Sequence, residues 1–158
     1  MSSQRVHSEA TEISHPYAVI LGLATLSAIA APATGVPPSE RELHTAQCVA
    51  ALDANTRELA RQVKGGHDEL RPMLLSRLEG GATFIGAAYL AGDRDEERSR
   101  ALLDSALEAQ KSLPESEVAA RQANCADEGA RQFAAANALE RAVVRRVAAK
   151  RMKRLLAE

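Results

Sequence analysis

Hydrophobic residues in the second part of the chain recur every three or four positions, which is the period of an α-helix. The first predicted helix begins at Ser39-Glu-Arg-Glu42, a capping box in which the serine and the glutamate bond to each other's backbone N–H groups. It ends near Lys64, before Gly65-Gly66, because glycine favours the position that follows a helix. Its predicted inner stripe comprises Cys48, Leu52, Leu59 and Val63, with Leu43 and Val49 beside it.

Two further helices follow in the prediction. One starts near Asp68 and ends at Gly92, and its apolar positions are Leu70, Leu74, Leu78, Ile85 and Tyr89. It contains Gly80-Gly81, a pair that marks either a break or a close contact with another helix. The next helix is predicted to follow Asp93, three residues before Glu96, and to end before Ser112-Leu-Pro-Glu115, a further start signal.

A last helical segment runs from Pro114 to about Ala157 with no further proline. Its apolar positions are Val118, Cys125, Phe133, Ala136, Leu139, Val143 and Val147. As one helix it would be about 65 Å long, so it either projects from the domain or breaks, and Gly129 is the expected point of the break. The fold class is therefore all-α, a small antiparallel bundle of about four helices with a long last one. We assign residues 39–140 to the helical domain and 141–158 to a basic helical tail.

The composition agrees with this fold class. The chain has 158 residues, of which 46% are hydrophobic and only 3% aromatic, and alanine is the commonest residue. Alanine favours helices and aromatic residues favour strands. The same composition excludes a collagen, a dense disulfide scaffold and a protein with many membrane spans.

The N-terminal part has the pattern of an export signal. Residues 17–31 carry no charge, and the triplets 28–30 and 31–33 fit the A-x-A pattern of signal-peptidase sites. As a helix this stretch would span about 22 Å, less than the ~30 Å hydrocarbon core of a bilayer. We therefore predict a signal peptide over residues 1–33 and a spacer over 34–38.

One feature departs from a signal peptide, because residues 1–16 hold Arg5 against Glu9 and Glu12. Either translation starts further along the chain, or residues 17–33 form an uncleaved signal anchor. A third interpretation is a buried N-terminal helix of a cytosolic protein.

The remaining chain holds two cysteines, Cys48 and Cys125. An even number of cysteines in an exported chain predicts one disulfide, which would join the first and last helical segments. The alternative is two buried free thiols.

Charge is divided unevenly along the chain. Residues 36–140 hold 12 basic and 18 acidic side chains, whereas residues 141–158 hold seven basic side chains and one acidic one. The seven are Arg141, Arg145, Arg146, Lys150, Arg151, Lys153 and Arg154. They predict binding to anionic lipid headgroups, to an acidic protein partner or to the acidic body of the same chain. The alternative is a solvated helix end, and nucleic acid fits an exported protein poorly.

The sequence contains few residues that suggest chemistry. His44 lies four residues before Cys48, on neighbouring helix surface, but a metal or haem site would need more ligands. The acidic run 93–97 lacks the spacing of a calcium loop, and no hydrolase, metalloprotease or phosphate-binding motif occurs. We predict no catalytic, cofactor-binding or metal-binding residues and no small-molecule substrate.

One segment resembles a single tetratricopeptide repeat. It consists of Ile85-Gly86-Ala-Ala-Tyr89, then Gly92, then a helix that ends before Pro114. The resemblance covers about 30 residues and implies a helical hairpin of the kind that stacks in adaptor proteins. No second copy occurs in the sequence.

These observations favour a small periplasmic or secreted helical protein, not an enzyme, that binds a partner or an anionic surface. The first alternative is an inner-membrane protein anchored by residues 17–33. The second is a tetratricopeptide-like adaptor.

Overall fold

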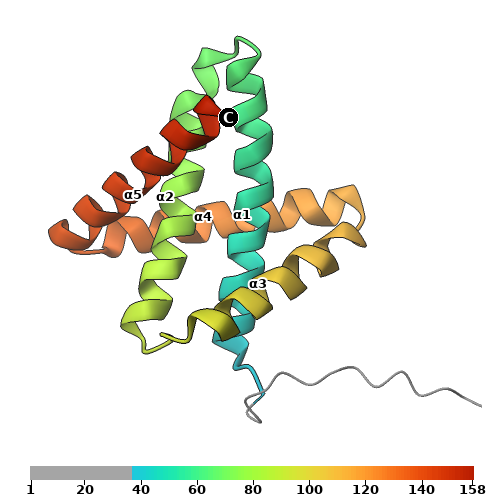
Figure 1. Ribbon diagram of the computed structural model, residues 1–158, viewed down its shortest axis with the longest axis vertical. Helices are drawn as coiled ribbons and strands as arrows, with labels where there is room; N and C mark the ends of the chain where they lie inside the picture. The colour runs from blue at the N-terminus through green and yellow to red at the C-terminus, as the bar shows by residue number, and fades with distance from the viewer. Residues whose placement is uncertain (1–36) are drawn as a thin grey trace, which may run out of the picture. The chain divides into compact units, whose positions relative to one another are not determined.

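The computed structural model describes residues 37–158, and all the regular secondary structure within this range is helical (Figure 1). Its elements are α1 (Glu40–Lys64), a 3-10 turn (Asp68–Leu70), α2 (Arg71–Leu90), α3 (Glu96–Lys111), α4 (Glu115–Ala135) and α5 (Ala138–Ala157). The all-α prediction is confirmed for this range. The predicted signal segment, residues 1–33, lies outside it. None of the helices described here has the length and hydrophobicity needed to cross a bilayer.

Local sequence signals fix both ends of α1. The Ser39 Oγ accepts the N–H of Glu42 at 3.2 Å, and the Glu42 Oε2 accepts the N–H of Ser39 at 2.7 Å, so the capping box is confirmed. Gly65 caps the C-terminus, and Gly66 follows with φ +104°, a conformation that only glycine adopts without strain.

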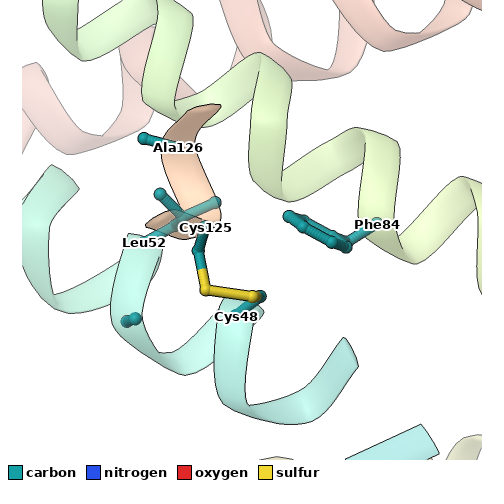
Figure 2. Close-up of a cluster of buried hydrophobic side chains, with 6 residues drawn as sticks. Cys48, Leu52, Phe84, Cys125 and Ala126 are labelled. Atoms are coloured by element: carbon teal, nitrogen blue, oxygen red, sulfur yellow. A yellow bond between two sulfur atoms is a disulfide. The ribbon is translucent and has the colours of Figure 1, made fainter. Parts of the chain in front are cut away.

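The predicted inner stripe of α1 forms the core. Cys48, Leu52, Leu59 and Val63 are all at most 6% exposed. They divide into two clusters. One contains Cys48, Ala51, Leu52, Phe84, Cys125 and Ala126 (Figure 2), and the other contains Leu59, Ala60, Val63, Leu74, Leu78 and Ala148. The core therefore joins α1 to α2, α4 and α5.

Helices α1 and α2 run antiparallel, and α4 crosses both of them (Figure 1). Gly80 lies in the middle of α2, which continues through Gly80-Gly81 without a break. A Cβ built on Gly129 of α4 would lie 2.8 Å from the Gly80 Cα. The two backbones are thus in direct contact, and the glycine pair of α2 marks a helix crossing rather than a break.

The last predicted segment is two helices, and it breaks at Ala136-Asn137 instead of Gly129. Ala136 is extended, with ψ 151°. Asn137 then caps α5, because its side chain accepts the N–H of Glu140 at 2.9 Å while the Glu140 carboxylate accepts the N–H of Asn137 at 3.0 Å. Gly129 is buried inside α4 against α2. After the break α5 turns back and packs on α2 and α1.

Helix α3 begins two residues later than predicted. Asp95, not Asp93, is the N-cap, and its Oδ1 accepts the N–H of Arg98 at 2.9 Å. Ser112 closes the end of α3, where its Oγ donates to the Ala109 carbonyl, so it does not start α4. Helix α3 packs on α1 and makes few contacts with α2. This arrangement differs from the helical hairpin that the tetratricopeptide resemblance implies.

An ion pair fastens α3 to the start of α1. The Arg98 Nε donates to the Glu42 Oε1 at 2.6 Å, and a second guanidinium nitrogen donates to the Glu42 Oε2 at 3.2 Å. The two side chains are only 19% and 16% exposed. The hydrogen bonds from Arg98, followed by the one from the Ser39 N–H, lower the pKa of Glu42 from 4.5 to about 2. The ionised form of Glu42 is therefore the one that stabilises the fold.

The helix crossing predicts opposite effects for two glycine-to-alanine changes. Gly129→Ala should lower the free energy of unfolding by about 1–2 kcal/mol, because overpacking outweighs the gain in helix propensity. Gly81→Ala is the matched control, since nothing lies within 4 Å of its added Cβ, and it should raise stability by up to about 1 kcal/mol. Urea unfolding measures both, and equal effects would contradict the contact.

The Glu42–Arg98 pair predicts a defined pH dependence. Because the folded-state pKa of Glu42 is lowered, its contribution is complete above about pH 4.5 and is lost as the pH falls toward 2. Glu42→Gln should cost about 1–2 kcal/mol at pH 7, and the cost should shrink toward pH 2. Unfolding at several pH values measures this. Glu40→Gln, in the same turn, is the control, and a cost of Glu42→Gln that is independent of pH would refute the assignment.

Candidate functional site

The two cysteines meet where α4 crosses α1. The Sγ atoms of Cys48 and Cys125 lie 2.05 Å apart, at disulfide distance, and join positions that are 77 residues apart in sequence (Figure 2). Cys48 is 1% exposed and Cys125 is 4% exposed. Phe84 of α2 covers the same cluster. The pair therefore links the two helices inside the core.

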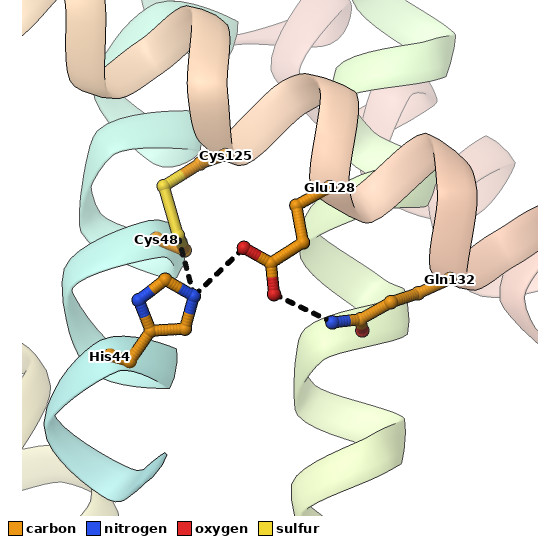
Figure 3. The surroundings of a disulfide bond; sticks show 5 residues. All are labelled: His44, Cys48, Cys125, Glu128 and Gln132. Carbon is orange, nitrogen blue, oxygen red and sulfur yellow. Dashed lines mark hydrogen bonds and ion pairs between the residues drawn. A yellow bond between two sulfur atoms is a disulfide. The ribbon is translucent and has the colours of Figure 1, made fainter. Parts of the chain in front are cut away.

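A polar cluster lies directly beside this disulfide (Figure 3). The His44 Nε2 is 2.9 Å from the Glu128 Oε2 and 3.8 Å from the Cys48 Sγ. The other carboxylate oxygen of Glu128 accepts a hydrogen bond from the Gln132 side chain at 2.9 Å. The side chains of His44 and Glu128 are 52% and 32% exposed, so the cluster joins the buried sulfurs to solvent.

His44 and Cys48 stand out in the sequence by their spacing, whereas Glu128 does not. Glu128 is three residues after Cys125 and so lies on the same side of α4. That spacing was the available signal. It becomes informative only when the cysteines are paired, because pairing brings the first turns of α1 to the middle of α4.

Three of the seven predicted basic residues hold α5 to the rest of the molecule. Arg141 donates to the Ala134 and Ala136 carbonyls at the end of α4. Arg145 lies over the ring of Phe133, 5.5 Å from its centre, and Arg151 pairs with Asp53 of α1.

The other four basic residues are exposed. They are Arg146, Lys150, Lys153 and Arg154, and among residues 37–158 none of them forms an ion pair with an acidic side chain. Three apolar residues lie among them, since Leu139, Val143 and Val147 are 75%, 55% and 51% exposed. At 3.6 residues per turn all seven fall within an arc of about 120°. We call these seven residues the α5 basic face.

The exposure of Val143 and Val147 corrects the predicted inner stripe. In a helix continuous with α4, these valines would share the buried side. The break at Asn137 changes the phase of α5, so Val144 and Ala148 are buried instead, at 9% and 1% exposure.

A basic recess adjoins the α5 basic face. It lies between α1 and α5, encloses about 670 Å³ and is lined by Arg57, Arg61, Lys64, Arg151 and Arg154, together with Ala54, Ala60, Leu155 and Glu158. Arg154 belongs to both surfaces. Two nearby acids are engaged, because Asp53 pairs with Arg57 and Arg151 and Glu58 pairs with Arg61, and Glu158 is the one acid in the lining itself.

A second, apolar groove lies between α1, α2 and α3 and encloses about 440 Å³. Val49 and Leu103 are among its lining residues. Ile85 and Tyr89, two of the apolar positions at helical spacing in the sequence, also line this groove and are 58% and 56% exposed. Helix α3 does not cover them, because it packs on α1.

Comparison with known proteins identifies no relative: no protein-family model, no curated protein and no solved structure matches this chain.

The disulfide predicts a large loss of stability on reduction. Linking positions 77 residues apart removes chain entropy from the unfolded state that is equivalent to roughly 4.5 kcal/mol. Reduction, or replacement of both cysteines by alanine, should lower the free energy of unfolding by a similar amount. Urea unfolding of the oxidised and reduced chain tests this, and coincident transitions would contradict it.

Proposed function

We propose that this chain is an exported, non-enzymatic helical protein that binds the surface of an anionic lipid bilayer through the α5 basic face. The observation that carries the proposal is the combination on that face. Four cations that have no acidic partner among residues 37–158 alternate with three exposed apolar side chains on one helix.

The alternation suits the interface of a bilayer. Lysine and arginine near an anionic surface each contribute about 1 kcal/mol of attraction. Leu139, Val143 and Val147 can enter the boundary between headgroups and acyl chains, where burial of apolar side chains is favourable. The long cationic side chains reach past them to the phosphates.

The division of charge orients the molecule toward such a surface. Residues 37–140 hold 12 basic and 18 acidic side chains, a net charge of about −6, whereas residues 141–158 carry a net charge of about +6. An anionic bilayer attracts one end of this dipole and repels the other, so approach through α5 is favoured. Arg154 extends the positive surface into the basic recess.

The alternative partners fit this face less well. The acidic body of the chain already engages α5 through Arg151 and Asp53, on another side of the helix. Nucleic acid would favour aromatic side chains for stacking, and the α5 basic face contains none. An acidic protein would match the cations but would leave the exposed valines without a specific role.

Export is supported by the cysteine pair, because disulfides persist in oxidising compartments. The predicted signal sequence agrees with it. If residues 17–33 remain as an anchor, the same face would act on the membrane that holds the chain.

Vesicle binding tests the proposal. Vesicles that contain phosphatidylglycerol should bind the protein at low salt and release it as the salt concentration rises. Replacing Arg146, Lys150 and Lys153 by glutamine should weaken binding by roughly 100-fold, from about 1 kcal/mol per residue. Val143→Gln with Val147→Gln should weaken binding with little change in its salt dependence. Cosedimentation measures both effects.

The matched control removes three exposed cations that lie outside both the α5 basic face and the basic recess, Arg100 and Lys111 of α3 and Arg131 of α4. It changes the net charge by the same amount and should retain most of the binding. If the two triple variants lose equal affinity for the vesicles, net charge alone would explain the binding, and the proposed face would be refuted. Absence of binding at low salt would refute the lipid assignment.

A further inference from the structure

Four side chains with metal-binding atoms converge at the crossing of α1 and α4 (Figure 3). Helix α1 contributes His44 and Cys48, four residues apart, and helix α4 contributes Cys125 and Glu128, three residues apart. Both spacings place the members of a pair on one side of a helix. The donor atoms are one imidazole nitrogen, two sulfurs and one carboxylate oxygen.

Three of the four donor atoms already lie close together, and the fourth, the Cys125 Sγ, is bonded to one of them, the Cys48 Sγ. The ligand atoms of His44, Cys48 and Glu128 all lie within 4.8 Å of one another. The His44 Nε2 is 2.9 Å from the Glu128 Oε2 and 3.8 Å from the Cys48 Sγ. In a tetrahedral zinc site with bonds of 2.0–2.3 Å, neighbouring ligand atoms are about 3.3–3.8 Å apart.

The disulfide keeps this site closed. A sulfur in a disulfide is not a thiolate, and the thiolate is the form of cysteine that ligates metals. Only two of the four donors, His44 and Glu128, are therefore available in the oxidised protein.

We propose that reduction of the disulfide opens a site for a zinc-type divalent cation, formed by the two cysteines with His44 and Glu128. A dithiol supplies two electrons and two protons, so the S–S bond breaks, two thiols form and the dithiol becomes a disulfide. The cation then replaces the two thiol protons, which are released to water. The neutral imidazole of His44 binds through Nε2 and carries its proton on Nδ1.

The surroundings hold the two outer ligands in place. Gln132 donates to one oxygen of Glu128 at 2.9 Å and leaves the other directed at His44. The rings of His44 and Phe84 pack edge to face, with ring centres 6.2 Å apart. Hydrogen bonds and packing of this kind orient metal ligands and raise affinity. The exposed sides of His44 and Glu128 give a cation a path from solvent.

Metal binding at this site would offset part of the stability that the chain loses when the disulfide is reduced. Opening the disulfide removes the link between α1 and α4, and a cation held by ligands from both helices would restore it. The metal-bound and oxidised forms would then both link α1 to α4 through the side chains of this cluster, whereas the reduced form without metal would lack such a link. Metal binding would stabilise the reduced chain by mass action.

Cobalt and zinc titration of the full chain tests the inference. The chain is reduced with a phosphine, which does not compete as a thiol. The reduced protein should bind one Co²⁺ with the visible spectrum of tetrahedral thiolate coordination, and Zn²⁺ should displace it. The oxidised protein should show no such spectrum. His44→Ala and Glu128→Gln should each weaken the affinity of the reduced chain at least about tenfold.

The matched control is His67→Ala with Glu69→Gln, because this second histidine–glutamate pair, 3.1 Å apart, lies in an exposed turn. It should leave the affinity unchanged. If His44→Ala and Glu128→Gln bind like the parent chain, the thiols alone hold the metal and the inference is wrong.

In case the reduced chain without metal is unfolded, circular dichroism is used to measure its helix content and thermal unfolding with and without Zn²⁺. Zn²⁺ should then restore the helices of the parent chain and restore them less well in His44→Ala. A zinc complex that stays unfolded, or equal binding by the oxidised protein, would overturn the inference.

Discussion

The contact between Gly80 and Gly129 determines how closely α4 approaches the α1–α2 pair. A side chain at Gly129 would hold the two helices apart, because its Cβ would meet the Gly80 backbone at 2.8 Å. Cys125 lies one turn before Gly129 on the same side of α4, so the close approach also brings its sulfur to Cys48. Glu128 reaches His44 for the same reason. The core and the polar cluster therefore depend on one crossing.

The sequence predicts well those features that depend on neighbouring residues. The capping box at Ser39 and the glycines after Lys64 define α1, because each signal acts within one helical turn. The stripe of α1 is buried as its spacing indicates. The role of Gly80 stayed open, since the same residue type marks a break or a close contact, and only the partner helix decides between them.

Features that depend on distant residues were missed or misplaced. Gly129 was expected to break the last helix because glycine disfavours helices, but packing against α2 uses its missing side chain. The break lies instead at Asn137, and here the missed signal is a local one, because the capping partner Glu140 is only three residues away. Glu128 was overlooked because its place beside His44 requires helices from distant parts of the chain to cross.

The break at Asn137 also determines what α5 can do. By turning the helix back onto α1 and α2, it buries Val144 and Ala148 and leaves Val143 and Val147 exposed. The same rotation of α5 about its axis divides its cations into two groups. Arg151 pairs with Asp53 of α1, whereas Lys150 faces solvent. The predicted tail is thus a packed helix whose outer side is already ordered. Binding through a rigid face loses less conformational entropy than binding through a flexible tail. This ordered surface, whose four cations have no acidic partner in the described part of the chain, therefore favours the proposed binding.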